Sequence, residues 1–316
     1  MIKTRTVFVL GAGASIPYGL HSGAELRKAL YELGEHEGNV YAKRLRDKEF
    51  GYTQEELLRF SRAFRRSRMY SIDAFLTRRS DHEELGKLAI AAVLCDREDP
   101  ETVVRSDPKE DWYSALWNAM ATSDIDKVAD ITRNQVRFVT FNYDRSLEYA
   151  LYLAINNTFL GASSAQAFAA VGELAILHVY GSLGEFCIEP REGGRQYVQS
   201  ADTRGIRTAA DAIRIIPEAR KDDKAFDKAR EWFNWAERIC FLGFSFDPLN
   251  VERLGLNEVV DAKAQRGDVF RIYASVYDLT QAEVGAASHA TCGGRNFIPG
   301  HPSWKALQTL REKGLL

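Results

Sequence analysis

Short apolar runs that alternate with helical patterns constrain this chain more than any other feature. The first run, Thr6–Leu10 (TVFVL), is rich in β-branched residues and ends at a glycine, as a buried parallel strand does. Similar runs recur at Val136–Phe141, Glu173–Tyr180, Arg238–Gly243 and Asp268–Ser275. Because helical patterns follow the strands, the sequence predicts an α/β fold of Rossmann-like type, with a doubly wound, mostly parallel sheet and helices on both faces.

Helical periodicity describes much of the chain between these runs. Apolar residues fall on one face of Gly23–Leu33, directly after the first strand and its glycine-rich turn. The polar stretch Glu189–Gly205 is expected to be a loop. The remaining helices predicted beside the sheet are residues 145–156, 224–237, 250–263 and 303–312.

The segment from Gly34 to Arg133 has a different character, because it is densely charged and contains no clear strand pattern. Its predicted helices are Gln54–Arg66, Ile72–Arg78, Glu83–Leu94 and Trp112–Thr122. We therefore expect one domain over residues 1–316 that carries a helical insertion subdomain at residues 34–133. The basic run RAFRRSR at residues 62–68 indicates a solvated helix face, with a partner or nucleic-acid contact as the alternative.

Composition excludes several classes of protein. The chain has 316 residues, of which 45% are hydrophobic, and a net charge of −2, which argues against a general nucleic-acid binder. The four cysteines are scattered without zinc-ligand spacing, so no metal is expected. No apolar segment is long enough for a signal peptide or a membrane span. We expect a soluble, cytoplasmic protein that makes no membrane contact.

Small and polar residues follow the carboxyl ends of four predicted strands. In open α/β sheets ligands bind at these ends, so four such groups together predict a ligand site. The groups are GAGAS at residues 11–15, NYD at 142–144, HVYGS at 178–182 and GFSFD at 243–247.

The first group carries glycines that allow a tight turn and close backbone approach. With Gly11 and Gly13 before a predicted helix, free amide groups at the helix start suit a pyrophosphate. A purely structural turn remains the alternative. No second strand with an acidic residue about 20 positions on follows, which weakens a dehydrogenase assignment.

The second and third groups carry side chains suited to chemistry. Asn142 and Asp144 are two residues apart, so on a continuing strand they project to one side, where they can position a water, a ribose hydroxyl or a carboxamide. Asp144 is equally well explained as the N-cap of a helix that begins at Arg145. His178 is equally well explained as a satisfied histidine in an apolar strand.

In this order, the four motifs resemble those of the sirtuin family, and more closely its bacterial sirtuin-like NAD-consuming branch. GAGAS resembles the family's cofactor loop, TFNYD its Asn-x-Asp strand end, HVYGSLG its His-Gly-Ser motif and FLGFSFDPLN its Gly-x-Ser loop. The resemblance covers residues 6 to about 275, except the segment from Gly34 to Arg133.

Three departures from the family pattern bear on the expected activity. Tyr180 stands where the family has its catalytic histidine before Gly-Ser, and His178 lies two residues earlier. On an unbroken strand both side chains would share a face. The deacylases' zinc-binding cysteine pairs are missing, as is their Asp-Phe-Arg segment after the cofactor loop. These absences argue against protein-lysine deacylation.

The resemblance implies an NAD+ glycohydrolase that cleaves the nicotinamide–ribose bond to give nicotinamide and ADP-ribose. Asn142 would act on the attacking water and ribose hydroxyls, Asp144 on the carboxamide side, and His178 or Tyr180 would accept a proton. The residues implied to bind NAD, here the substrate, are Gly11, Ala12, Gly13, Ser15, Gly181, Ser182, Gly243 and Ser245.

Unchecked NAD hydrolysis would harm a cell, so we expect control by homo-oligomer assembly or by a partner. The resemblance to antiphage-defence systems implies a nucleic-acid translocase ATPase or an Argonaute-like protein as that partner. The alternative is a non-catalytic NAD or ADP-ribose sensor that uses the same pocket. A third interpretation, a structural subunit of a nucleic-acid complex, would require DNA binding by residues 62–68.

Overall fold

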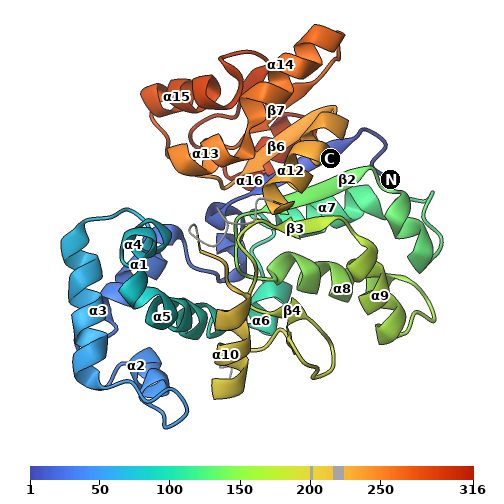
Figure 1. Ribbon diagram of the computed structural model, residues 1–316. Helices are drawn as coiled ribbons and strands as arrows, with labels where there is room; N and C mark the ends of the chain where they lie inside the picture. Colours follow the sequence, from blue (N-terminus) through green and yellow to red (C-terminus); the bar gives the residue numbers. More distant parts are fainter. Residues whose placement is uncertain (200–201, 216–223) are drawn as a thin grey trace.

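The computed structural model describes residues 1–199, 202–215 and 224–316. Its centre is a six-stranded sheet in which all neighbouring strands are parallel, in the order β3-β2-β1-β6-β7-β8 (Figure 1). The predicted α/β, Rossmann-like fold is therefore confirmed. The strands are β1 (Thr6–Leu10), β2 (Val136–Thr140), β3 (Ile176–His178), β6 (Arg238–Leu242), β7 (Arg271–Ala274) and β8 (Phe297–Pro299).

The first strand lies in the middle of the sheet, and the chain builds outward from it in two directions. Strand β1 pairs with β2 on one side, where Phe8 lies opposite Phe138, and with β6 on the other, where Phe8 lies opposite Cys240. The strand order therefore reverses between β1 and β6. In folds of this kind, the crevice beyond the carboxyl ends at such a reversal is where ligands bind.

Two hydrophobic cores, one on each face of the sheet, follow from strand alternation. In β1, Val7 and Val9 belong to the first core, and Phe8 and Leu10 belong to the second. Helices that bury residues in the first core are α1 (Gly23–Glu32), α2 (Val40–Leu45), α3 (Gln54–Ser67), α4 (Ile72–Arg78), α5 (Glu83–Cys95), α10 (Thr203–Ala212), α12 (Lys224–Trp235), α13 (Pro248–Leu254), α14 (Leu256–Arg266) and α15 (Gln281–Cys292). Helices that bury residues in the second core are α6 (Pro100–Val104), α7 (Trp112–Met120), α8 (Ser146–Thr158), α9 (Ser164–Glu173) and α16 (Ala306–Glu312).

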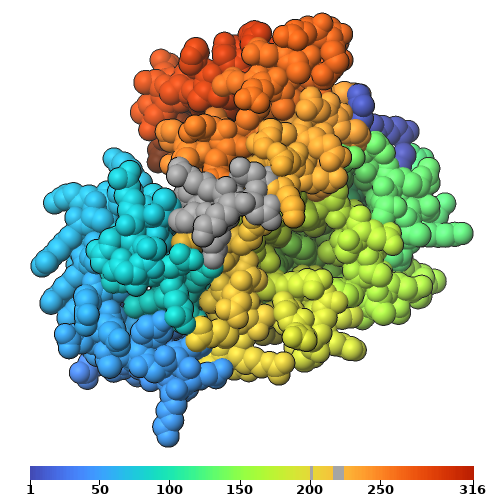
Figure 2. Space-filling view, viewed as in Figure 1, coloured from blue at the N-terminus to red at the C-terminus, as the bar shows by residue number. Residues whose placement is uncertain are grey.

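The segment predicted as a helical insertion is helical, since residues 11–135, all of which the structure describes, contain no strand. Its helices fall into two groups. Helices α2 to α5 gather on one side of the molecule, in blue and teal, and the C-terminal segments lie above them in orange and red (Figures 1 and 2). In contrast, α7 packs against α8 and α16 and buries its apolar residues in the second core. The basic run on α3 is exposed at Arg62, Arg65, Arg66 and Arg68, and Arg65 pairs with Glu35 at 2.5 Å.

Several predicted elements were wrong in extent. The run Glu173–Tyr180 forms a strand over three residues, because α9, capped by Ser163, occupies the chain up to Glu173. The predicted helix over residues 250–263 is two helices, since Gly255 adopts a left-handed conformation with φ of 59° between them.

Other elements had not been predicted. They are α6, α9, α10, α15 and β8, together with a short parallel ribbon of β4 (Glu185–Phe186) and β5 (Gly194–Arg195). The stretch expected to be a loop up to Gly205 contains β5 and the start of α10. Among the described residues, no helix combines the length and apolar character that crossing a membrane requires.

Candidate functional site

Two glycine loops meet where the strand order reverses. The amide of Gly13 donates to the carbonyl of Gly243 at 3.0 Å, and Gly243 has a φ of +57°. A Cβ on Gly243 would lie 2.0 Å from the amide nitrogen of Ala14, and one on Gly11 would lie 2.5 Å from the carbonyl oxygen of Gly243. Glycine is therefore required at these positions for the loops after β1 and β6 to touch.

The backbone amides of the first loop point inward. Those of Gly11, Gly13, Ala14 and Ser15 donate to carbonyl oxygens of the β6 loop or of the same loop, at 2.9 to 3.1 Å. Two short 3₁₀ turns follow the loop, and α1 begins later, at a capping box of Ser22 and Glu25. The helix predicted after the glycine-rich turn is confirmed as α1. Because these four amides donate within the two loops, they offer no free donors here, and pyrophosphate binding by Gly11, Ala12, Gly13 and Ser15 stays a prediction.

Asn142 links three of the four strand ends. Its side-chain Nδ2 donates to the carbonyl of Gly11 and to the hydroxyl of Ser15, both at 3.0 Å. Its own carbonyl accepts a hydrogen bond from Nδ1 of His178 at 2.8 Å. These bonds fix the orientation of the Asn142 side-chain amide, and the residue remains partly accessible.

Asp144 lies at the start of α8, where one of the two interpretations of the sequence places it, and its role towards a ligand stays a prediction. Its Oδ1 accepts from the amide of Ser146 at 3.1 Å and from the Ser146 hydroxyl, and Ser146 is the first residue of α8. Since the N-cap of α8 is Arg145, Asp144 holds the helix start from one residue before the cap, and the predicted helix start at Arg145 was one residue early. Burial raises the pKa of Asp144, although hydrogen bonds from Ser146 and Ser15 oppose that shift. The carboxyl group therefore contacts Ser15, which also accepts a hydrogen bond from Asn142.

His178 is held at both ring nitrogens. Nδ1 faces the Asn142 carbonyl, which can accept but not donate, and Nε2 lies 2.6 Å from Oε1 of Glu148. Burial opposes charging of the ring, but Glu148 and the Asn142 carbonyl outweigh it and raise the pKa of His178. With acceptors at both nitrogens, the geometry favours the imidazolium form.

Tyr180 lies in different surroundings from His178. Its hydroxyl donates to Oδ1 of Asn250 at 2.7 Å, and its ring packs edge-on against Phe141 and Phe226. Because β3 ends at His178, strand alternation does not extend to Tyr180. The expectation that both side chains share one face is therefore wrong, since they contact different helices.

The residues after Tyr180 form a tight turn. Gly181 has a φ of +73°, and a Cβ there would lie 2.0 Å from the carbonyl oxygen of Ala212. The hydroxyl of Ser182 donates to the carbonyl of Gly184 at 3.0 Å. These contacts explain why glycine is needed at position 181 by close approach to the end of α10, without reference to a ligand.

A cavity of about 360 Å³ opens at the strand-order reversal, beside the exposed Ser245. Its wall combines the two glycine loops with apolar and aromatic side chains, as small-molecule sites usually do. The lining residues are Gly13, Ile16, Pro17, Glu110, Gly243, Phe244, Ser245, Ser275, Tyr277, Leu279, Lys305 and Ala306.

Sequence reasoning missed four polar residues that complete the site. Tyr113 shares a 2.7 Å hydrogen bond with Ser146, and Glu148 holds His178. Asp73, on α4, accepts from the hydroxyl of Tyr143 at 2.6 Å. Burial raises the pKa of Asp73, and the nearby charge of Asp247 adds to this effect. Glu148 had a signal, an acid in the first turn of the predicted helix, but the other three had none.

Asp247, which directly precedes Pro248, caps α13, because its carboxylate accepts from two backbone amides. Among the described residues, no group of three or more His, Cys, Asp or Glu side chains is placed to hold a metal ion. Neither a protein-family model nor a curated protein sequence matches this chain.

Proposed function

We propose that this protein is an NAD+ glycohydrolase that releases nicotinamide and leaves ADP-ribose. The observation that carries the proposal is the Asn142 side chain, bonded to the Gly11 carbonyl and the Ser15 hydroxyl at the carboxyl edge of the sheet. An amide fixed in this way, beside the strand-order reversal, is suited to orient a ribose hydroxyl or a water molecule.

The proposed reaction requires little acid–base catalysis by the protein. Nicotinamide leaves as a neutral group from a cationic ring, and the ribose passes through a transition state of oxocarbenium character, as in glycoside cleavage. The contribution of the side chains is then positioning and electrostatics. Asn142 would hold the ribose and the attacking water, and the carboxyl group of Asp144 would face the carboxamide side.

The cavity beside Ser245 would take the adenosine half of NAD. Its volume of about 360 Å³ is at the lower end of small-molecule sites. Tyr277 and Leu279 offer apolar surface for a base, and Gly243 and Ser245 would face the adenosine ribose. Since four amides of the Gly11–Ser15 loop are engaged, the pyrophosphate would rely on Lys305, whose Nζ pairs with Glu110 at 2.5 Å.

His178 would act as a positioning residue in this scheme. An imidazolium with acceptors at both nitrogens is a poor proton acceptor, but it fixes the Asn142 backbone through a 2.8 Å hydrogen bond. Tyr180, bonded to Asn250, would form part of the wall of the site.

The cellular role that fits such an activity is NAD depletion in antiphage defence, held in check until the protein assembles or meets a partner. A homo-oligomer is the simplest form of such control. An ATPase, translocase or Argonaute-like protein is the partner that the sequence resemblance suggests. Tests of activity should therefore cover more than one assembly state.

A second candidate function is a non-catalytic sensor of NAD or ADP-ribose. It is favoured by the engagement of both His178 and Tyr180 with other side chains, which leaves neither ready to accept a proton. The two functions share the cavity and differ in turnover.

Nicotinamide release from NAD by the purified chain tests the proposal. Asn142→Ala is expected to reduce the rate by about 10²-fold or more, on the scale of losing one fixed hydrogen bond to the transition state, here a bond accepted by Oδ1. Asn157→Ala is the matched control, because its exposed amide bonds to a carbonyl on its own helix. NAD binding without turnover in every assembly state would favour the sensor, and absence of both would contradict both functions.

A further inference from the structure

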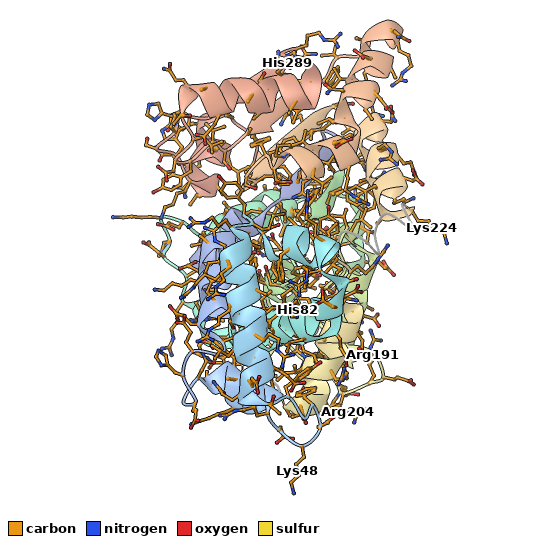
Figure 3. All side chains as sticks on the ribbon, turned by 60° about the vertical axis from the view of Figure 1, so that its left-hand side comes forward. Lys48, His82, Arg191, Arg204, Lys224 and His289 are labelled. Carbon is orange, nitrogen blue, oxygen red and sulfur yellow. The ribbon has the colours of Figure 1, made fainter. Side chains whose placement is uncertain are left out.

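A second cavity lies away from the sheet edge, between the β4–β5 ribbon and the first turn of α10. Its volume is about 500 Å³. Arginines are conspicuous among its lining residues, and Figure 3 shows two of them, Arg191 and Arg204, on the same side of the molecule. The described residues that line it are Pro190, Arg191, Gly194, Arg195, Gln196, Val198, Asp202, Arg204, Gly205 and Thr208.

Arg195 carries a buried donor without a partner. The side chain is 6% exposed, and its Nη1 donates to Glu98 and to the carbonyl of Leu183, both at 2.9 Å. Its Nη2 has no hydrogen-bond partner among the described residues. A buried charged donor left unpaired costs free energy, so an arginine in this state indicates an acceptor that arrives from outside the chain.

The charge of the surrounding cluster also calls for an anion. Glu98 is fully buried and is shared between Arg195 and Arg145, which is 1% exposed, so the three side chains carry one net positive charge. Arg145 and Arg195 cannot lose their protons under physiological conditions. One acidic group therefore serves two buried cations.

The cavity wall adds to this positive potential. Arg204 has no ion-pair partner within the ranges that the structure describes, whereas Arg191 pairs with Glu185 at 2.6 Å. The helix α10 is ten residues long and presents its N-terminus here. Asp202, the one acid among the described lining residues, is its N-cap, and its carboxylate accepts from the amide of Gly205 at 2.7 Å.

We propose that this cavity binds a phosphate-bearing small molecule, with Arg195 and Arg204 as its anion ligands. Arginine pairs with phosphate oxygens through two parallel donors, which an unpartnered Nη2 can complete. A cavity of about 500 Å³ with Pro190 and Val198 in its wall fits a compound of nucleotide size better than a nucleic-acid strand. The site is separate from the NAD cavity and does not depend on NAD hydrolysis.

Calorimetric titration of the full chain with inorganic pyrophosphate tests the site. Arg204→Gln is expected to weaken pyrophosphate binding about tenfold, the effect of losing one charge-assisted contact. Arg207→Gln is the matched control, because Arg207 lies on the same helix but pairs with Glu84 at 3.1 Å. It should leave the affinity unchanged. Arg191→Gln should weaken binding less than Arg204→Gln.

Four results would overturn the proposal. One is an absence of pyrophosphate binding to the wild-type chain. Another is equal weakening by Arg204→Gln and Arg207→Gln, which would indicate general electrostatics. A third is weakening by Lys305→Gln but not by Arg204→Gln, which would assign the binding to the NAD cavity. The last is an oligonucleotide that binds in an Arg204-dependent way while pyrophosphate does not, which would make the site a nucleic-acid contact. Thermal unfolding of each variant confirms that it is folded.

Discussion

The two sides of the strand-order reversal differ in the kind of residue that forms them. We call the β2–β3 side the bonded side and the β6–β7 side the open side. On the β2–β3 side, partly or fully buried polar and charged groups are bonded to one another, from Ser15 through Asn142 to the His178–Glu148 pair. On the β6–β7 side, two glycine loops touch and then open into a cavity lined largely by apolar side chains. The bonded side fixes the orientation of its polar side chains, and the open side provides a cavity. The proposed NAD+ glycohydrolase activity would use both, the first to position the ribose and the second to accommodate the adenosine.

The most severe test of the bonded side is to remove a charge beneath it. Glu98 is fully buried and accepts from Arg145 and Arg195, and Arg145 directly follows Asp144. Glu98→Gln is expected to lower the free energy of unfolding by about 3–5 kcal/mol, because it leaves two buried arginines without their counter-charge. Urea denaturation measures this. Glu101→Gln, at an exposed pair with Arg105, should change stability by less than about 1 kcal/mol. Similar losses of unfolding free energy in both variants would contradict the expectation that the buried pair contributes more than the exposed one.

The open side should be destabilised by steric clash rather than by loss of a charge. Gly243→Ala places a Cβ 2.0 Å from the Ala14 amide nitrogen in a left-handed backbone conformation. We expect a loss of about 3 kcal/mol in unfolding free energy, at the upper end of backbone strain. Gly267→Ala isolates the backbone term, since Gly267 has a φ of +72° with no atom near the added Cβ, and should cost about 1 kcal/mol. Equal losses in the two variants would show that the loops can move apart.

The charged histidine gives the bonded side a dependence on pH. Because the pKa of His178 is raised above its ordinary 6.5, its contribution is fully present below pH 6.5 and is lost as pH rises through the raised pKa. Glu148→Gln should therefore cost about 1.5–3 kcal/mol at pH 6 and less at alkaline pH. Denaturant titrations across this range measure the difference. If the stability of the Glu148→Gln/His178→Gln double variant depends on pH as much as that of the wild type, or more, the pair is not the source of the pH dependence.

The smallest stability effect is expected at the mouth of the cavity. Lys305 and Glu110 are partly exposed, so Lys305→Ala should change unfolding free energy by less than about 1 kcal/mol. If the cavity takes the adenosine half of NAD, the same variant raises KM and leaves kcat nearly unchanged, because it removes ground-state binding. A fall in kcat with constant KM would contradict that placement.

The sequence predicted the strands that matter most for the fold. The runs TVFVL and RICFL are apolar, β-branched or aromatic, and bounded by glycine, so their limits were nearly right. Helix Ile72–Arg78 was predicted to the residue, and in the structure the Ser71 side chain caps its start. Strand β8 was missed because its three residues give too short a pattern, and α15 because its small, alternating residues show little amphipathic character.

The location of the candidate site could be predicted from the sequence, but the hydrogen bonds between its side chains could not. Parallel strands bring their carboxyl ends to one edge, so Asn142, Asp144 and Gly243 had to lie near Gly11 once the strands were assigned. Which atom each side chain contacts depends on rotamers and on helix packing that no local pattern encodes. Glu98, for example, reaches Arg145 across 47 residues, and nothing in its own neighbourhood marks it as buried.

The central position of β1 has a consequence for biosynthesis. This strand is made first, but its partners are residues 136–140 and 238–242, so its two edges stay unpaired until most of the chain has been synthesised. Contacts this distant in sequence form slowly and leave apolar edges open to aggregation in the meantime. The growing chain is therefore expected to depend on chaperones, and truncation before residue 238 should give an aggregating product rather than a smaller folded domain.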